Sequence, residues 1–416
     1  MKKIYIILII ILSHISISKA SEQILENYSN IAEAKYNDSL ILARAMLNEV
    51  SNFLVKPNEE NMIRLKKSWL SARKVYQQTE VFRFGNPIVD DWEGKVNAWP
   101  LDEGLIDYVD MTNYYPSEND FSNFNVVANK ILKVEGNEVD ATIIDFNLLE
   151  NKLHEIGGNE ANVATGYHAI EFLLWGQDLN GTNAGNGNRP YTDFSLNECT
   201  NNNCDRRRNY LKVTTELLVK DLEDMKNYWS HNGIARKDLL EAGENIGIKR
   251  ILTGMGSLSY GELAGERMKL GLMLNDPEEE HDCFSDNTHN SHFYNVIGIQ
   301  NVYLGRYKSI SGKNINGPSI SQAVARIDKE LDIELKKSIS NTVFYMNKIV
   351  ESADNGVAYD MLIAENNKRG NKVIQDAVDS LVIQSKGIEK VAVTLNIRDL
   401  HVEGSDSLDN PDAVFN

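Results

Sequence analysis

The sequence predicts an all-α protein built from two helical bundles that pack side by side. Apolar residues recur every three or four positions along most of the 416 residues, which is the period of an amphipathic helix. Segments with two-residue alternation, which would indicate strands, are nearly absent. No tandem repeat of 20–50 residues is visible, so a solenoid is not supported. Helical bundles are therefore the expected architecture.

The composition indicates a folded, acidic protein. Hydrophobic residues make up 42% of the chain and charged residues 25%, which is typical of globular proteins. The formal net charge is −17, with acidic side chains spread along the chain. Such a surface repels nucleic acids and anionic lipid headgroups and attracts cations. We therefore expect no nucleic-acid partner.

Residues 1–20 have the pattern of a secretory signal peptide. Lys2 and Lys3 form a positively charged N-terminal region, an apolar run covers residues 4–12, and small residues precede a cleavage site after Ala20. The apolar run is shorter than the roughly 20 residues needed to span a bilayer. We expect an exported protein of the periplasm or cell envelope, with no transmembrane span in the mature chain.

In the first half of the chain, the periodic segments are interrupted by clear stop signals. Pro57 ends the first helix, and Gly85 is a plausible end for the second. Residues 86–123 have no helical period and are rich in aromatic and acidic residues, which is typical of a functional loop or lid. The helices expected in this half cover residues 22–54, 59–83, 140–153 and 166–175.

A polar segment, residues 180–203, is rich in glycine and asparagine and is the best candidate boundary between the bundles. We expect an N-terminal bundle at 21–195, a C-terminal bundle at 205–400 and a polar tail at 401–416. The helices expected in the second bundle cover residues 206–229, 237–274, 293–304, 320–334, 339–351 and 371–397.

The three cysteines allow one disulfide. Export makes disulfides permissible, and Cys199 and Cys204 could close a small ring within the polar segment. Pairing of Cys283 with either of them stays open. A tetrahedral thiolate zinc site is not supported, because a second cysteine pair is missing.

The most distinctive segment is residues 166–178, with the sequence GYHAIEFLLWGQD. His168 and Glu171 lie three positions apart, so both side chains leave the same face of the expected helix. That face is otherwise apolar, and unpaired burial of a polar group costs roughly 2–7 kcal/mol. Either a metal ion or a network of hydrogen bonds and ion pairs would satisfy the two side chains.

This segment resembles the signature of the imelysin family, exported bacterial proteins that include the iron-regulated protein A group. Residues 79–85 (TEVFRFG) and 99–102 (WPLD) also resemble segments of that family. The resemblance implies that two further carboxylates, Glu80 and Asp102, share one metal site with the His168–Glu171 pair. The place of Asp102 could instead be taken by Glu103, Asp90 or Asp91. For Glu80, the alternative is an ion pair with Arg83 at the end of its helix.

Residues 276–289 contain six carboxylates and two histidines. This segment resembles the iron-regulated branch of the family, where it is thought to line the cleft between the domains. Several of its residues are also common in helix caps and turns, so a structural role stays open. The candidates for the cleft or for the surroundings of the metal are Arg83, Tyr167, Glu266, Arg267, Asp286 and His289.

The expected ligand set predicts one divalent or trivalent metal ion. One imidazole with two or three carboxylates favours iron or manganese, with iron preferred, and zinc or calcium is possible. The leading hypothesis, which rests mainly on the resemblance, is an exported metal-binding protein of iron uptake or envelope iron handling. It would take a metal ion or metal chelate and work with envelope iron-transport proteins.

Two alternatives stay open. The first is a metallopeptidase of the imelysin type, although the zinc-peptidase pattern HExxH fails where Gly158 replaces its second histidine. The second is a cell-envelope binding module without a metal.

Overall fold

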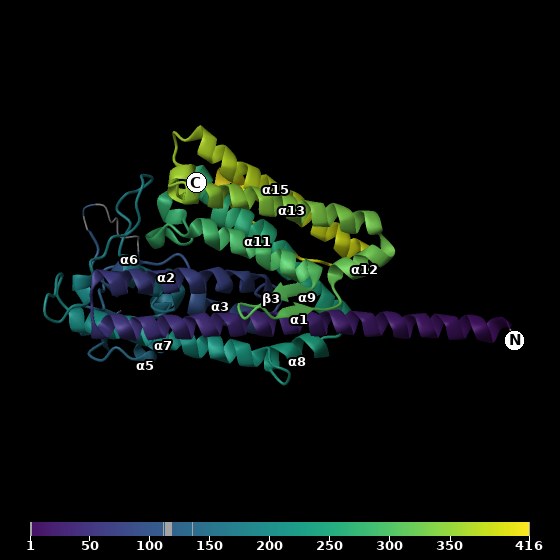
Figure 1. Cartoon of the computed structure of the whole chain (residues 1–416), viewed down its shortest axis with the longest axis horizontal. Helices are drawn as coiled ribbons and strands as arrows, with labels where there is room; N and C mark the ends of the chain where they lie inside the picture. The colour runs from purple at the N-terminus through teal and green to yellow at the C-terminus, as the bar shows by residue number, and fades with distance from the viewer. Residues whose placement is uncertain (1, 111, 113–118, 135, 416) are drawn as a thin grey trace.

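The computed structural model describes residues 2–110, 112, 119–134 and 136–415. Helices make up nearly all of its regular structure, which confirms the all-α prediction. The longest helix, α1 (Lys2–Val55), runs along one side of the molecule, and its N-terminal part extends beyond the other helices (Figure 1). The described strands form two antiparallel hairpins, β1 (Ile131–Val134) with β2 (Asn137–Asp140) and β3 (Arg306–Lys308) with β4 (Asn314–Asn316).

One layer of helices is built on α1, which packs along α2 (Glu59–Tyr76) and α7 (Cys204–Tyr228). Aromatic side chains of α1, including Tyr36 and Phe53, are buried in this layer. The other elements of this part are η1 (Gln77–Phe82), α3 (Pro87–Asn97), α4 (Glu103–Ile106), α5 (Phe146–Leu148), η2 (Leu149–Leu153), η3 (Ile156–Gly158), α6 (Gly166–Trp175) and η4 (Tyr191–Phe194).

A second layer consists of α13 (Lys329–Asp354), α15 (Lys368–Thr394) and η5 (Leu258–Lys269), with α15 packed against both of the others (Figure 1). The remaining elements are α8 (Ile234–Glu241), α9 (Glu244–Ser257), α10 (Leu270–Leu274), η6 (Pro277–Glu279), η7 (Cys283–Ser285), α11 (Thr288–Leu304), α12 (Ile320–Ile327), α14 (Tyr359–Ile363), α16 (Asp406–Asp409) and η8 (Pro411–Phe415).

Helix α11 joins the two layers. It contacts α13 on one side and α2 and η1 on the other (Figure 1). Gly298 permits the close approach to η1, because a Cβ at this position would lie 2.8 Å from the carbonyl oxygen of Gln78. The main buried apolar cluster extends from Ile24 to Ile397 and so draws on both ends of the chain. The predicted division into bundles at 21–195 and 205–400 stays a prediction, as does the tail at 401–416.

Several element boundaries differ from those expected. Helix α3 forms inside the segment predicted as irregular. Pro87 suits its first position, because a helix leaves the N–H of that residue unbonded and the fixed φ of proline matches the helix. Strand β2 extends to Asp140, so helical structure begins only at Phe146 rather than at residue 140. Two helices were expected at 320–334 and 339–351, but the break between them lies at Asp328, which caps α13 by accepting a hydrogen bond from the Leu331 N–H.

Cys199 and Cys204 form a disulfide with their Cα atoms 5.9 Å apart, and Cys283 is buried with a free thiol. This is the small ring that the spacing allowed, and the alternative pairings of Cys283 are not formed. No described helix is both long and apolar enough to cross a membrane. The signal peptide at 1–20 stays a prediction, and its first residue lies outside the described residues.

Candidate metal centre

The predicted histidine and glutamate lie on α6, a helix whose ten residues are all buried. Gly166 begins it with φ +81°, and a Cβ there would lie 2.5 Å from the carbonyl oxygen of Val96. Only glycine allows this approach of α6 to the end of α3. The Thr165 hydroxyl donates a 2.9 Å hydrogen bond to the Lys95 carbonyl and ties the same two segments together.

His168 and Glu171 are in contact, as their spacing requires. The Nδ1 atom of His168 lies 3.2 Å from Glu171 Oε2, and both residues are fully buried. The other carboxylate oxygen of Glu171 accepts hydrogen bonds from the Ser285 N–H (3.0 Å) and from its hydroxyl (2.6 Å). Glu171 therefore connects α6 to the acidic segment 276–289.

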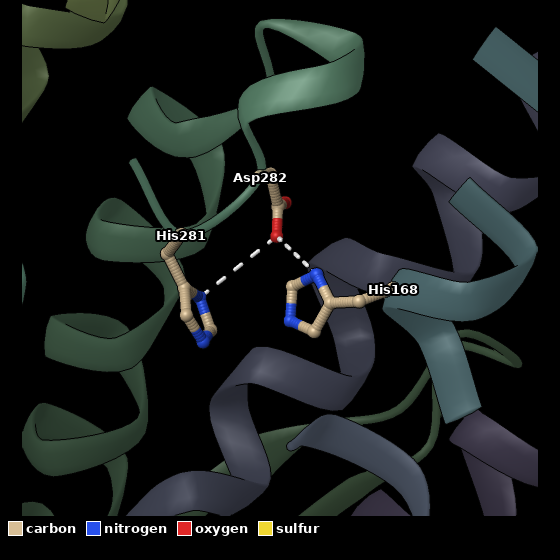
Figure 2. Close-up of side chains that lie close together, drawn as sticks. All are labelled: His168, His281 and Asp282. Carbon is tan, nitrogen blue, oxygen red and sulfur yellow. Dashed lines mark ion pairs between the residues drawn. The ribbon is translucent and has the colours of Figure 1, made fainter. Parts of the chain in front are cut away.

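Two residues that the sequence analysis did not single out complete a group that could hold a metal ion. Ligand atoms of His168, His281 and Asp282 all lie within 4.8 Å of one another, and no other such group occurs among the described residues (Figure 2). Asp282 Oδ1 is 4.0 Å from His168 Nδ1 and 3.8 Å from His281 Nδ1. The available signal was the adjacent His-Asp pair in the acidic segment, but the sequence does not show which of its residues face α6.

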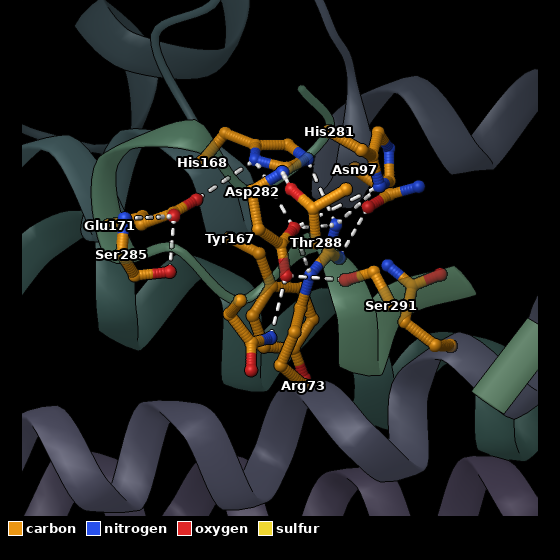
Figure 3. A network of polar contacts seen from close by, with 12 residues as sticks. Arg73, Asn97, Tyr167, His168, Glu171, His281, Asp282, Ser285, Thr288 and Ser291 are labelled. Carbon is orange, nitrogen blue, oxygen red and sulfur yellow. Dashed lines mark hydrogen bonds and ion pairs between the residues drawn. The ribbon is translucent and has the colours of Figure 1, made fainter. Parts of the chain in front are cut away.

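The guanidinium of Arg73, on α2, lies among these three side chains (Figure 3). Arg73 Nη2 is 2.9 Å from Asp282 Oδ1, 3.0 Å from His168 Nε2 and 3.3 Å from His281 Nδ1. Its Nε donates a second hydrogen bond, of 3.0 Å, to Asp282 Oδ1. Since a guanidinium only donates hydrogen bonds, His168 Nε2 and His281 Nδ1 must present their lone pairs to it.

Burial and neighbouring charges determine the protonation of the group. Burial lowers the pKa of both His168 and His281 well below the usual value, and nearby guanidiniums lower it further. Burial opposes ionisation of Asp282, but the Arg73 charge, the neighbouring His168 and the hydrogen bonds from Arg73 and Ser291 together outweigh it and lower the pKa of Asp282 to about 2. Burial and the Asp282 charge raise the pKa of Glu171 well above its usual range. The group therefore consists of two neutral imidazoles and one carboxylate.

Glu80 lies beside the group without touching the histidines. Its Oε2 accepts hydrogen bonds from Arg267 Nη2 (2.9 Å) and from the Asn97 amide (3.2 Å). Asn97 also accepts a hydrogen bond from Arg73, so one amide links the two buried ion pairs. The partner of Glu80 is thus Arg267 and not Arg83.

The structure places the other predicted carboxylate, Asp102, in a different environment. It accepts a hydrogen bond from Asn119, which also donates to the Asn162 side chain. Its alternative Glu103 is buried and accepts a 2.8 Å hydrogen bond from Gln177. Burial, with a smaller contribution from Glu278, raises the pKa of Glu103 to about 8.

The remaining cleft candidates are distributed over several sites. The ring of Tyr167 lies 5.3 Å from the Arg73 guanidinium carbon. Asp286 is half-buried, and His289 contacts the Asn290 amide at 2.7 Å. Neither belongs to the three-residue group. The others line a cleft, where Glu266 is exposed and Arg83 pairs with Asp90 at 2.9 Å.

This cleft has a volume of about 740 Å³ and is strongly acidic. It is lined by residues from 83–100, 155–160 and 262–281, and His281 and Trp99 belong to its wall. Two guanidiniums face nine carboxylates, which are Asp90, Asp91, Glu93, Glu155, Glu160, Glu262, Glu266, Glu278 and Glu279. Its charge favours cations, and it reaches one member of the three-residue group.

Comparisons with known proteins agree with this fold. The family model described as imelysin matches residues 32–387. A putative iron-regulated protein A precursor from Parabacteroides distasonis has a similar structure, with a TM-score of 0.64, 16% identity, and coverage of 91% of this chain and 95% of that one. An imelysin-like protein from Psychrobacter arcticum has a TM-score of 0.58 and 13% identity, with 92% and 97% covered. No curated protein matches the chain.

Proposed function

The chain belongs to the imelysin family, and from this premise we propose that it is an exported metal-binding protein whose ligands are His168, His281 and Asp282. The observation that carries the proposal is the convergence of these three buried side chains, one of which, His281, lines an acidic cleft. The nine carboxylates of the cleft would attract a cation and repel an anionic chelate. We therefore infer that the metal enters as a free cation.

The donor atoms favour a transition metal. Two imidazoles and one carboxylate suit Fe²⁺, Mn²⁺ or Zn²⁺, whereas Ca²⁺ prefers a shell made of oxygen atoms. This set replaces the one expected from the sequence, because His281 and Asp282 take the places given there to Glu80 and Asp102. Glu171 then acts as the partner that orients the His168 ring, a role common among residues next to metal ligands.

Iron is the metal we favour, and handling of iron in the cell envelope is the role. The supporting observations are the name of the Parabacteroides distasonis relative, an iron-regulated protein A precursor, and the predicted signal peptide at 1–20. Hydrolysis of peptides receives less support from the geometry. A metallopeptidase needs a general base beside the metal-bound water, and Glu171 is already engaged by Ser285 and His168.

The test is elemental analysis of protein purified without a histidine tag and loaded anaerobically with Fe²⁺. We expect about one iron per chain in the wild type, and a loss of at least tenfold in affinity in His281→Ala and Asp282→Asn. His154→Ala is the matched control, since His154 is largely buried but lies outside the group. Wild-type protein that binds no metal, or a His281→Ala variant that binds like the wild type, would contradict the proposal.

A further inference from the structure

Arg73 contacts the same atoms that would bind the metal. We propose that Arg73 is the counter-cation of the metal-free site and that metal binds by exchange, with the guanidinium withdrawing as the ion enters. This inference rests on the proposed function and concerns the regulation of the same site. It predicts that Arg73 lowers the affinity for metal and so makes the bound ion easier to release.

The distances make the two cations mutually exclusive. One nitrogen, Nη2, is 2.9–3.3 Å from an acceptor atom on each of Asp282, His168 and His281. A metal ion bonded to the same three atoms would lie about 2.0–2.2 Å from each. It would therefore occupy the space of the guanidinium nitrogen. The lone pairs that face Arg73 are those that a metal would use, since His168 Nδ1 is already engaged by Glu171.

Exchange also keeps the charge of Asp282 neutralised. Arg73 and Asp282 are both fully buried, and an unpaired carboxylate at such a depth is strongly unfavourable. While no metal is bound, the guanidinium supplies the positive charge. When a metal binds, it supplies that charge instead, and Arg73 is released from Asp282.

The surroundings of Arg73 offer the guanidinium a second position inside the protein. Its central carbon lies 5.3 Å from the ring centre of Tyr167, 5.7 Å from Tyr76 and 6.0 Å from Trp69, all within the range of cation–π attraction. Asn97, which accepts a hydrogen bond from Arg73, also donates one to Glu80. A small shift away from Asp282 therefore leaves the guanidinium among aromatic faces and next to Asn97, the amide that also binds Glu80.

The test compares the wild type, Arg73→Met and Arg207→Met in their affinity for Mn²⁺, measured by equilibrium dialysis with elemental analysis. Methionine keeps an unbranched apolar chain in place of the arginine stem and removes the charged guanidinium. Arg207 is the control, because it is also fully buried and ion-paired, with Asp107, but lies outside the metal group. We expect at least about tenfold tighter binding in Arg73→Met, and wild-type affinity in Arg207→Met.

The outcomes separate this inference from the proposed function. Equal or weaker binding by Arg73→Met, in a wild type that binds Mn²⁺, would overturn the exchange and leave the metal site intact. If neither protein binds, both proposals fail. Binding by Arg73→Met alone would also overturn the exchange, because the wild-type guanidinium would then block the site and not withdraw from it. If Arg73→Met does not fold, Arg73→Lys is measured in its place. Lysine cannot form both hydrogen bonds that Arg73 donates to Asp282. Tighter metal binding by Arg73→Lys would support the exchange, and unchanged binding would overturn it.

Discussion

Replacing Asp282 by asparagine tests whether Asp282 and Arg73 stabilise the fold together as one buried ion pair. Asp282 accepts two hydrogen bonds from Arg73 and one, of 2.7 Å, from Asn287. Both charged side chains are fully buried, so solvent does not screen the pair. Asparagine would leave the Arg73 charge unpaired, and losing one partner of such a pair costs about 3–5 kcal/mol.

The assay is a double-mutant cycle in the presence of a chelator. We expect Asp282→Asn and Arg73→Met each to lower the free energy of unfolding by about 3–5 kcal/mol, as measured by denaturant titration. The double variant should lose at least about 2 kcal/mol less than the sum, because it leaves no buried charge unpaired. The exposed pair Arg44–Glu223 is the control, and Arg44→Met should cost at most about 1 kcal/mol. Additive losses at Arg73 and Asp282 would refute this account of the network.

Three further predictions concern the supporting structure, and each is checked by equilibrium unfolding. Gly166→Ala should lower the free energy of unfolding by more than about 2 kcal/mol, because the new Cβ would collide with Val96. The control Gly356→Ala, with φ +82° but open space around it, should lower it by about 1 kcal/mol. Equal losses in the two variants would contradict the role of the contact with Val96. Burial raises the pKa of Glu103 to about 8, so ionisation of Glu103 destabilises the wild type as the pH rises from about 4.5 to 8. The stability of Glu103→Gln relative to the wild type should therefore grow across that window by about 1.4 kcal/mol per pH unit. A constant difference in stability would contradict this prediction. Cys199→Ser opens the ring to Cys204 and should cost about 2 kcal/mol, with no change in metal affinity; a loss of metal would contradict this.

Part of the candidate site could be predicted because it is local. Residues three apart on a helix share a face, so the contact between His168 and Glu171 follows from their spacing alone. The pair Cys199–Cys204 was likewise suggested by its short separation. The position of Arg73 along its helix is a weaker signal. Arg73 lies four residues after Trp69 and three before Tyr76, so on a helix it shares a face with two large aromatic side chains.

Other features depended on contacts between distant segments. His281 and Asp282 reach His168 only because the segment 276–289 packs against α6, where Ser285 binds Glu171. Glu80 is buried, but its neighbours are Arg267 and Asn97 and not a histidine. The periodicity of a helix shows that a side chain is buried, and it does not show what the side chain meets.

The sequence by itself therefore determined the helical class, the family resemblance and the paired His168 and Glu171 on one buried face. These follow from short-range geometry, in which spacing along the chain sets direction in space. Only the tertiary structure decided that His281, Asp282 and Arg73 share a centre beside an acidic cleft. The physical reason is that the packing of α2, α6 and the segment 276–289 depends on complementary shape and charge between whole surfaces, which no local pattern encodes.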